Sequence, residues 1–420
     1  MRKQNHDLDL GTLGFGAGTP ADLGTTDVWE ALASRAQSTS AYCSLPRLTR
    51  SALGAFPVTE KAQYKADPRA FASADLGSAC LRMESSGTAG TPSVVYRTAS
   101  EMTLNARAVA ERWSGLFDRD PRRILSLVDH NWTAVGPLIE LVAQELGAVL
   151  ARGFPFGPHN GPRPGLIRAI LEFRPDVVVA TPGELLTLEG DWRRAEQFEE
   201  LAGPVEKLLL LGEPITRALM ARLERSWSAA AIAASYGSTE TGTVATGCRD
   251  GALHVIDDRF VLEVRDGEAI EPLRPGGRGE LIVTPLRAEA TILVRYATGD
   301  RIEAHACACG IPATGLRILG RFDDQVCVSG REMGPEEIED LVFRTPFVQD
   351  YQLEVGPDDE VRALRLQLFP GTSWSDRNTV ASSVDLPVKF VPHIPEFARA
   401  GGVVKSWRRT RVVRSGKEPA

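Results

Sequence analysis

The stretch "DVVVATP", Asp176–Pro182, decides the fold class together with "GLIRAILEFRP", residues 165–175, which precedes it. Three consecutive valines make a short apolar segment, which is typical of a strand buried on both faces. The preceding segment has apolar residues at helical spacing and ends at a proline. A helix followed by a buried strand is the repeating unit of a parallel sheet covered by helices.

The same alternation extends along the chain on both sides of 176–182. The other predicted helices and strands are "SEMTLNARAVAERWSGLF" (100–117, a helix capped by Ser100), "RRILSLVDH" (122–130, a strand), "GPLIELVAQELG" (136–147, a helix), "AVLARGF" (148–154, a strand), "KLLLLGEP" (207–214) and "AAIAASYGSTE" (230–240). This rhythm indicates an α/β fold with parallel sheets covered by helices.

From about residue 252 to 320 the pattern changes to closely spaced strands, which predicts a smaller antiparallel unit or barrel. A boundary follows at "GRFDDQVCVSG", 320–330, where turn residues precede a strand and an acidic helix start. We therefore expect a large domain at 1–320, with parallel sheets and a strand-rich subdomain. A small mobile α+β domain is expected at 321–420.

Composition excludes several classes of protein. The 420 residues are 43% hydrophobic and 25% charged, which is ordinary for a globular chain, and the net charge of −7 gives no basis for nucleic-acid or membrane binding. There is no run of 18 apolar residues, and "MRKQNHDLDL" lacks the apolar core of a signal peptide. These features predict a soluble cytoplasmic protein.

The segment "SSGTAGTP", residues 85–92, lies between two predicted strands and is rich in glycine and hydroxyl side chains. Backbone N–H groups of such a loop can point into one concavity that suits a phosphate. It is not a Walker-type loop, because it lacks the Gly-Lys-Ser/Thr ending and a strand follows it. Read alone, a plain hairpin turn remains an alternative.

Five stretches in this order resemble the core motifs of the adenylate-forming superfamily, which includes acyl-CoA synthetases, nonribosomal-peptide adenylation domains and luciferases. They are "SSGTAGTP" (85–92), "LGEP" (211–214), "SYGSTE" (235–240), "RYATGD" (295–300) and "GRFDDQVCVSG" (320–330). The stretch "LEFRPDVVVATPGELL", 171–186, is similar to the phenylacetate-CoA ligase branch. The resemblance covers most of the chain and implies an ATP-dependent, AMP-forming acid–thiol ligase.

The resemblance also implies roles for single residues at the ATP site. The ATP-binding set is Ser85, Ser86, Gly87, Thr88, Gly90, Gly212, Glu213, Pro214, Tyr236, Gly237, Ser238, Thr239, Asp300 and Arg321. In this set the opening loop holds the β- and γ-phosphates, Tyr236 lies against adenine, and Asp300 accepts both ribose hydroxyls. Arg321 reaches the ribose or a phosphate.

Two further residues of "SYGSTE" have chemical roles by resemblance. Thr239 lies at the α-phosphate, and Glu240 holds Mg²⁺, a hard cation that prefers oxygen ligands. Many relatives carry a lysine in the opening loop, where this chain has Thr91 and Ser93. The departure leaves one positive charge fewer on the phosphates.

The family also needs a C-terminal lysine that stabilises charge during adenylation. "GGVVKSWRRTRVVR" offers Lys405 and "RSGKEP" offers Lys417, and we prefer Lys405 because a basic and apolar stretch follows it. Asp323 is expected at the hinge about which the small domain turns between the two half-reactions.

Cys248, His254, Cys307 and Cys309 offer three sulfurs and one imidazole, a set that suits tetrahedral structural zinc. The spacing is not that of a standard zinc finger, so buried unliganded thiols are the alternative. The phenylacetate-CoA ligase branch often has cysteines and a histidine after these motifs, which favours zinc. His305 is a substitute ligand.

The leading hypothesis is a ligase that uses ATP and Mg²⁺ to activate a small carboxylic acid and passes the acyl group to coenzyme A. Gly330 matches a glycine of the pantetheine tunnel in relatives, and Trp132 suits an aromatic acid. A carrier-protein thiol or an amine is an alternative acceptor. A catalytically silent nucleotide-binding homologue is the second hypothesis. The sequence leaves the acid, the role of His130 and homo-oligomer formation open.

Overall fold

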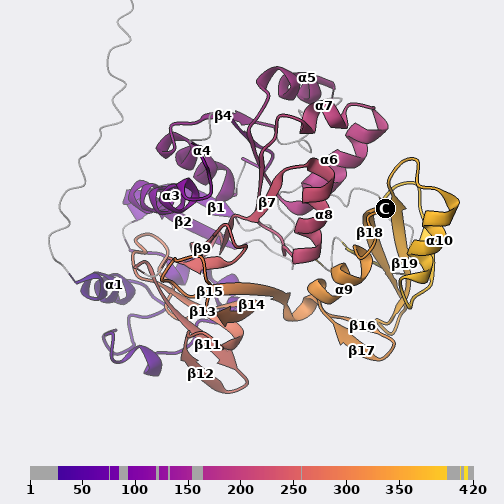
Figure 1. Ribbon diagram of the computed structural model, residues 1–420. Coiled ribbons are helices and arrows are strands. Elements are labelled where there is room, and N and C mark those ends of the chain that lie inside the picture. The colour runs from indigo at the N-terminus through magenta and orange to yellow at the C-terminus, as the bar shows by residue number, and fades with distance from the viewer. Residues whose placement is uncertain are drawn as a thin grey trace, which may run out of the picture.

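The computed structural model describes residues 27–74, 76–84, 93–119, 123–130, 133–153, 164–256, 258–394, 407 and 411–414. Three bodies of secondary structure lie side by side: a parallel sheet between helices, an antiparallel sheet, and a C-terminal α+β part (Figure 1). The α/β class is therefore confirmed.

The parallel sheet has the strand order β4-β3-β5-β6-β7. Its strands are β3 (Arg123–Ser126), β4 (Val149–Arg152), β5 (Val177–Ala180), β6 (Lys207–Leu210) and β7 (Ala230–Ala233). Alternate residues point to opposite faces, so Val178 enters one hydrophobic core and Val177 and Val179 enter the other. Burial on both faces explains the continuous apolar run at 177–180.

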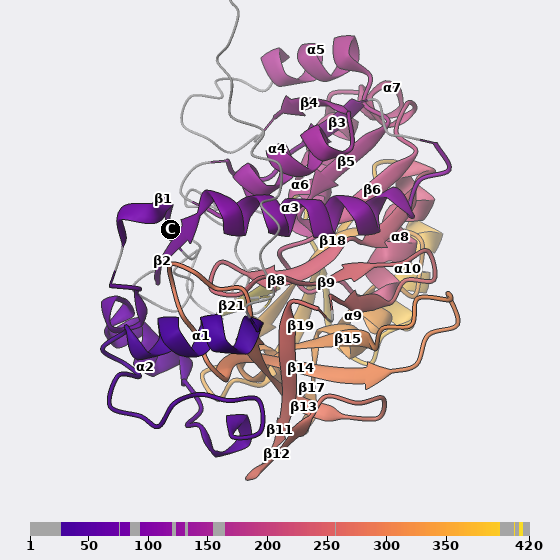
Figure 2. The same cartoon turned by 90° about the vertical axis from the view of Figure 1, so that its left-hand side faces the viewer.

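Helices cover both faces of this sheet. They are α3 (Ala99–Ser114) and α4 (Val135–Glu145) on one face, and α5 (Pro164–Phe173), α6 (Pro182–Arg194), α7 (Phe198–Ala202) and α8 (Arg217–Trp227) on the other. Figure 2 shows α3 lying across the near side of the molecule. The predicted alternation of helices and strands is confirmed.

The start of α3 differs from the sequence expectation. The cap is Thr98, whose hydroxyl accepts from the Glu101 amide at 3.1 Å, while the Glu101 carboxylate accepts from the Thr98 amide at 2.7 Å. These two reciprocal hydrogen bonds supply acceptors for two backbone amides that have no partner within the helix. Ser100, the predicted cap, lies inside the first turn because only Thr98 has a glutamate three residues later.

The antiparallel sheet has eight strands in the order β12-β11-β13-β14-β15-β10-β9-β8. They are β8 (Ser235–Ser238), β9 (Gly242–Gly247), β10 (Leu253–Val255), β11 (Phe260–Asp266), β12 (Ala269–Pro272), β13 (Arg278–Pro285), β14 (Tyr296–His305) and β15 (Gly315–Arg321). The strand-rich unit predicted at 252–320 is confirmed. It also includes β9 and β8, and β8 lies in the segment 230–240 that the sequence placed with the parallel sheet.

The N-terminal segments pack onto the same unit. They are α1 (Val28–Gln37), three short 3-10 turns (Leu53–Ala55, Pro68–Phe71 and Leu76–Ser78), α2 (Lys61–Ala66) and the antiparallel pair β1 (Ala79–Glu84) and β2 (Val94–Thr98). β1 and β2 are the strands predicted on either side of the loop at 85–92, which itself lies outside the described residues.

The C-terminal part follows a 3-10 turn at Phe322–Asp324. Its elements are β16 (Val326–Val328), β17 (Arg331–Met333), α9 (Pro335–Val342), β18 (Val348–Val355), β19 (Val361–Leu368), α10 (Trp374–Ser382), β20 (Val388–Phe390) and β21 (Val412–Arg414). Side chains of α9 and β18 belong to the same hydrophobic cluster as those of α6 and α8. In this arrangement the two parts share one core.

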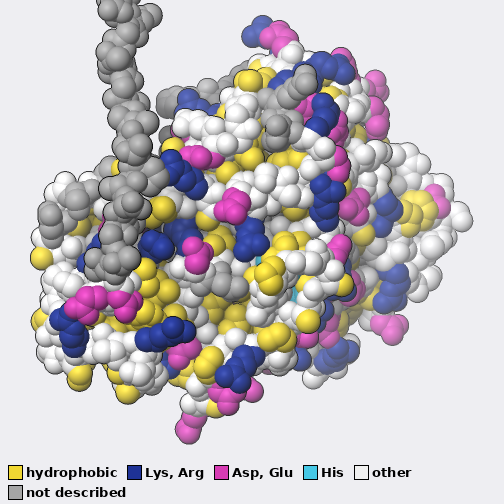
Figure 3. Space-filling model, turned by 60° about the vertical axis from the view of Figure 1, so that its left-hand side comes forward, with side chains coloured by type: hydrophobic (Ala, Val, Ile, Leu, Met, Phe, Trp, Pro, Cys, Tyr) yellow, Lys and Arg dark blue, Asp and Glu magenta, His cyan; other side chains and the backbone are white. Residues whose placement is uncertain are grey.

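Figure 3 shows acidic and basic side chains interspersed on one face of the molecule, with apolar side chains between them. Within the described ranges, no helix has the length and apolar character needed to cross a bilayer.

Candidate active site

Two hollows meet at β8. The larger hollow, about 1900 Å³ with its open mouth, lies toward β14 and β15, and the smaller hollow, about 1080 Å³, lies toward α3. Gly212, Ser235, Gly237 and Ser238 line both hollows. A β-carbon added at Gly237 would lie 2.1 Å from the carbonyl oxygen of Gly242, so only glycine fits there.

Asp300, Tyr236 and Arg321 form one hydrogen-bonded group in the larger hollow. The Tyr236 hydroxyl donates to Asp300 Oδ2 at 2.8 Å, and Arg321 Nε donates to Asp300 Oδ1 at 3.2 Å. Asp300 and Arg321 are cross-strand partners of β14 and β15. Burial, followed by Asp300, raises the pKa of Tyr236 well above its usual value, so the hydroxyl remains a donor. Three residues predicted for the ATP site are thus brought together.

Thr239 and Glu240 follow β8 and are both buried. Arg97 of β2 donates to the carbonyl oxygens of both residues, at 3.1 Å and 2.5 Å. The guanidinium also pairs with Glu101 at 3.2 Å. Arg97 therefore fixes the backbone of this turn, and Glu240 lines the larger hollow while Thr239 lines the smaller one.

The loop Gly212–Pro214 lies between the two hollows, after β6. Gly212 has φ of +82°, a conformation that glycine adopts without strain. Glu213 Oε2 accepts from the amide of Gly183, the second residue of α6, at 3.0 Å. The carboxylate thus points back to a helix start, which its negative charge stabilises, while Pro214 lines the larger hollow.

Lys61 is the residue of this site that the sequence reasoning missed. It belongs to α2, and its Nζ donates to the carbonyl oxygen of Thr298 at 3.1 Å inside the larger hollow. Burial, then the neighbouring Arg321 charge, lowers the pKa of this lysine, whereas Asp300 and Glu240 raise it. No local motif marks it, because Lys61 and Thr298 are 237 residues apart in sequence.

Several predicted residues lie outside the described residues: Ser85, Ser86, Gly87, Thr88, Gly90, Trp132, Lys405 and Lys417. The structure does describe two residues close in sequence to the candidate lysines, Trp407 and Arg414. Trp407 is buried, donates to the Tyr351 hydroxyl at 2.9 Å, and lines a small hollow with Glu213 and Pro214. Arg414 is exposed on β21, 3.6 Å from Asp359.

Asp323, the predicted hinge, is exposed in the turn between β15 and β16. Its neighbour Asp324 is fully buried and accepts from the Arg321 amide at 3.0 Å. Gly330 lies in the hairpin turn between β16 and β17 with φ of +77° and is exposed.

His130 makes two side-chain contacts at the end of the parallel sheet. Its Nδ1 lies 3.0 Å from Glu140 and its Nε2 lies 3.0 Å from the Ser126 hydroxyl. Burial lowers the pKa of this imidazole, although Glu140 opposes the shift. Both ring nitrogens are therefore engaged within the protein.

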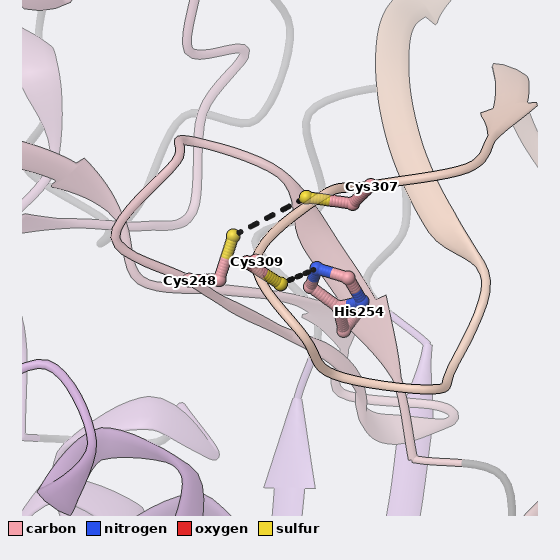
Figure 4. Close-up of side chains that lie close together, drawn as sticks. All are labelled: Cys248, His254, Cys307 and Cys309. Atoms are coloured by element: carbon pink, nitrogen blue, oxygen red, sulfur yellow. Dashed lines mark hydrogen bonds between the residues drawn. The ribbon is translucent and has the colours of Figure 1, made fainter.

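Cys248, His254, Cys307 and Cys309 converge beside the larger hollow (Figure 4): His254 lies on β10, and the cysteines lie on the loops that join β9 to β10 and β14 to β15. Their ligand atoms all lie within 4.8 Å of one another. The sulfurs of Cys248 and Cys307 are 3.9 Å apart, and that of Cys309 is 3.2 Å from His254 Nε2. His305, the alternative ligand, is not part of this group.

This geometry fits a metal better than a disulfide. A disulfide needs sulfurs about 2.05 Å apart, whereas a tetrahedral zinc with Zn–S bonds near 2.3 Å separates its sulfurs by about 3.8 Å. His254 Nδ1 lies 2.9 Å from the carbonyl oxygen of Ala313, so Nδ1 is the protonated nitrogen and Nε2 faces the sulfurs with its lone pair. The four side chains have the donor types and orientation that zinc requires.

Sequence comparison gives relatives for most of this architecture. The chain is 31% identical to phenylacetate-coenzyme A ligase of Thermus thermophilus over 283 residues, 64% of this chain and 61% of that protein. It is 26% identical to the Escherichia coli enzyme of the same name over 290 residues, 68% and 65% of the two chains. The chain thus spans less than two thirds of these relatives.

Solved structures share the fold. A crystal structure of 2-hydroxyisobutyryl-CoA ligase with 2-HIB-AMP superposes with a TM-score of 0.68 at 18% identity, covering 86% of this chain and 80% of that one. ATP-bound MatB from Rhodopseudomonas palustris gives a TM-score of 0.54 at 17% identity, with coverage of 79% and 68%.

Residues 25–284, more than half of the chain, match the AMP-binding enzyme family. The match covers the loop at 85–92, the turn after β6 and the "SYGSTE" segment, whose geometry is described above. The chain belongs to the AMP-binding enzyme family, and within it the sequence is similar to phenylacetate-coenzyme A ligases.

Proposed function

We propose that the protein uses ATP to convert a carboxylic acid into an acyl-adenylate and then transfers the acyl group to the thiol of coenzyme A, releasing AMP. The observation that carries this proposal is the Tyr236–Asp300–Arg321 group, because it sets a carboxylate, a phenol and a guanidinium in one hollow beside Glu240. Similarity to phenylacetate-coenzyme A ligases supports the same reaction class.

In the first half-reaction the acid carboxylate attacks the α-phosphorus of ATP and pyrophosphate leaves. Both partners are anionic, so the protein has to position them and offset negative charge. Thr239 holds the α-phosphate, Asp300 accepts from the ribose hydroxyls, and Arg321 and Lys61 supply positive charge. The Glu240 carboxylate is the kind of oxygen donor that Mg²⁺ prefers, so Glu240 would hold Mg²⁺, which would offset negative charge on the phosphates. Lys405 is the catalytic lysine of this step.

Lys61 supplies a positive charge in place of the lysine that the loop at 85–92 lacks. Relatives that carry a loop lysine place one cation on the phosphates, and this chain has Thr91 and Ser93 instead. Lys61 lies on the wall of the larger hollow with its ammonium held by only one protein acceptor, the Thr298 carbonyl, among the described contacts. A bound nucleotide phosphate would accept its remaining hydrogens.

For the second half-reaction we propose that residues 321–420 rotate about Asp323 to withdraw Lys405 and admit the thiol along Gly330. The rotation has to break side-chain contacts between the parts, two of which are hydrogen bonds: Thr216 donates to Glu339, and Arg222 donates to the Gln349 carbonyl oxygen at 2.8 Å. Both contacts are buried, so they favour the arrangement described here.

We also propose one structural zinc held by Cys248, His254, Cys307 and Cys309. Four protein ligands leave no open position, so this metal would stabilise the loops after β9 and β14 and take no part in the reaction.

Acid-dependent pyrophosphate release tests the first half-reaction, and mass spectrometry of the coenzyme A product tests the second. An aromatic acid such as phenylacetate is the first substrate to try. Acid-dependent release followed by acyl-CoA formation is the expected result. Release without acyl-CoA would point to a carrier-protein thiol or an amine as acceptor, and ATP binding without release would support the silent homologue.

A further inference from the structure

The smaller hollow has an uneven distribution of charge. Five charged side chains line it: Glu84, Arg97, Glu101, Arg259 and Arg287. Arg97 pairs with Glu101 at 3.2 Å, and Glu84 pairs with Arg82 at 2.8 Å. Arg259 and Arg287 form no ion pair with any residue that the structure describes.

Arg259 is held in place with one edge of its guanidinium open. Its Nη1 donates to the carbonyl oxygen of Leu104 in α3 at 2.7 Å, and its Nε is buried with no acceptor in the described part of the chain. Nε and Nη2 form the edge with which arginine grips a carboxylate through two parallel hydrogen bonds. The single contact to Leu104 leaves that edge for a ligand.

The electrostatic surroundings favour an anion at this position. The pKa of Arg259 is lowered to about 10, mainly by burial; Asp258 opposes this shift, and the nearby charges of Arg287 and Arg97 add to it. A partly buried cation without an ion pair is costly, and a bound anion lowers that cost.

Part of the remaining wall is apolar. Met102, Val135, Leu138 and Phe260 line the same hollow, which continues past Gly237 to Thr239. An acid with its reacting carboxylate near Thr239, at the β8 end, would lay its apolar body against these side chains. Arg259 and Arg287 line the same hollow.

We propose that the substrate is a dicarboxylic acid whose second, unreacted carboxylate is bound by Arg259 and Arg287. This inference rests on the proposed function, because it names the substrate class for the same site. Arg259 and Arg287 are specificity-determining residues that do not touch the reacting carboxylate. The matched monocarboxylic acid leaves both arginines without an anion and binds more weakly.

The test uses pairs of acids that differ only in the terminal carboxylate, 4-carboxyphenylacetate with phenylacetate and adipate with hexanoate. Acid-dependent pyrophosphate release gives kcat/KM, and the rise in melting temperature caused by each acid without ATP gives binding independently of turnover. We expect the wild-type protein to prefer the dicarboxylate of at least one pair. Arg259→Met should lower kcat/KM for that dicarboxylate by roughly thirtyfold or more and change that for its partner by less than about threefold.

Two controls separate the outcomes. Arg274→Met, an exposed arginine in the loop before β13, should behave as wild type. Arg259→Lys keeps the positive charge but cannot form the bidentate hydrogen bond to a carboxylate. It should therefore recover only part of the kcat/KM for the dicarboxylate that Arg259→Met loses. The inference would be overturned if Arg259→Met lowered kcat/KM by the same factor for mono- and dicarboxylic acids, or if it raised only the KM for ATP.

The two proposals fail in different ways. Preference for monocarboxylates with normal turnover would overturn this inference and leave the proposed function standing. Thermal stabilisation by a dicarboxylate that is lost in Arg259→Met, without pyrophosphate release, would support this inference and count against the proposed function. No stabilisation and no turnover with any of the four acids would overturn the inference.

Discussion

The two hollows that meet at β8 differ in how their charges are balanced. In the larger hollow the Asp300 carboxylate already has Tyr236 and Arg321 as partners, and Lys61 donates to a backbone carbonyl. In the smaller hollow two arginines have no carboxylate partner among the described residues. The paired charges of the larger hollow are preorganised for one ligand, the nucleotide. The unpaired arginines of the smaller hollow instead favour acids that carry a second negative charge.

The first way to break this comparison is to remove Lys405, the lysine that we propose for the adenylation step. We expect Lys405→Ala to slow adenylation by roughly a hundredfold or more, because a preorganised charge on the transferring group contributes several kcal/mol. Pyrophosphate exchange measures this step. Lys417→Ala is the matched control, because it removes the other candidate lysine, and should change the rate little. Inactivation by the Lys417 change would show that the lysine is misassigned.

The next largest effect is expected from Asp300→Asn. The amide cannot accept from both Arg321 and the ribose hydroxyls as a carboxylate does, so kcat/KM for ATP should fall by roughly ten- to a hundredfold. The effect should be equal for all acids, unlike that of Arg259→Met. Asp266→Asn at the exposed end of β11 is the control. An acid-dependent effect of Asp300→Asn would mean that the two hollows are not separate in function.

Lys61→Met tests the site residue that the structure revealed and the sequence did not. Loss of its charge should raise the KM for ATP by about tenfold with a smaller change in kcat, because one partly buried phosphate contact is removed. Steady-state kinetics with saturating acid measure both constants. Lys389→Met removes a lysine that pairs with Glu354 far from the hollow and should have no effect. An unchanged KM would remove Lys61 from the site.

The smallest kinetic effect is expected at the Cys/His cluster. Protein purified without chelator should carry about one zinc, and Cys309→Ser should lower the melting temperature by about 5 °C or more. Activity at 25 °C per folded molecule should change less than about twofold, because no open coordination position faces the substrate. Cys43→Ser changes an exposed thiol and serves as the control. Elemental analysis that finds no metal in the wild-type protein would contradict the assignment.

The sequence predicted the helix and strand order of the parallel sheet because burial on both faces leaves a local record, an apolar run such as 177–180. It also brought out Tyr236, Asp300 and Arg321 through their motifs. It misplaced the cap of α3, where Thr98 and Ser100 are both hydroxyl residues and only the glutamate spacing distinguishes them. It placed β8 with the parallel sheet, because a four-residue strand carries no signal of its partner.

The sequence by itself determined the fold class and the motif residues of the larger hollow, because each is encoded within a window of a few residues. Only the tertiary structure decided that Lys61 reaches Thr298, that Cys248 and Cys307 approach within 3.9 Å, and that Arg259 has no carboxylate partner in the described chain. These properties depend on contacts between residues 59 to 237 positions apart. No periodicity or local propensity records such pairings, since they arise when separate elements pack around a common core.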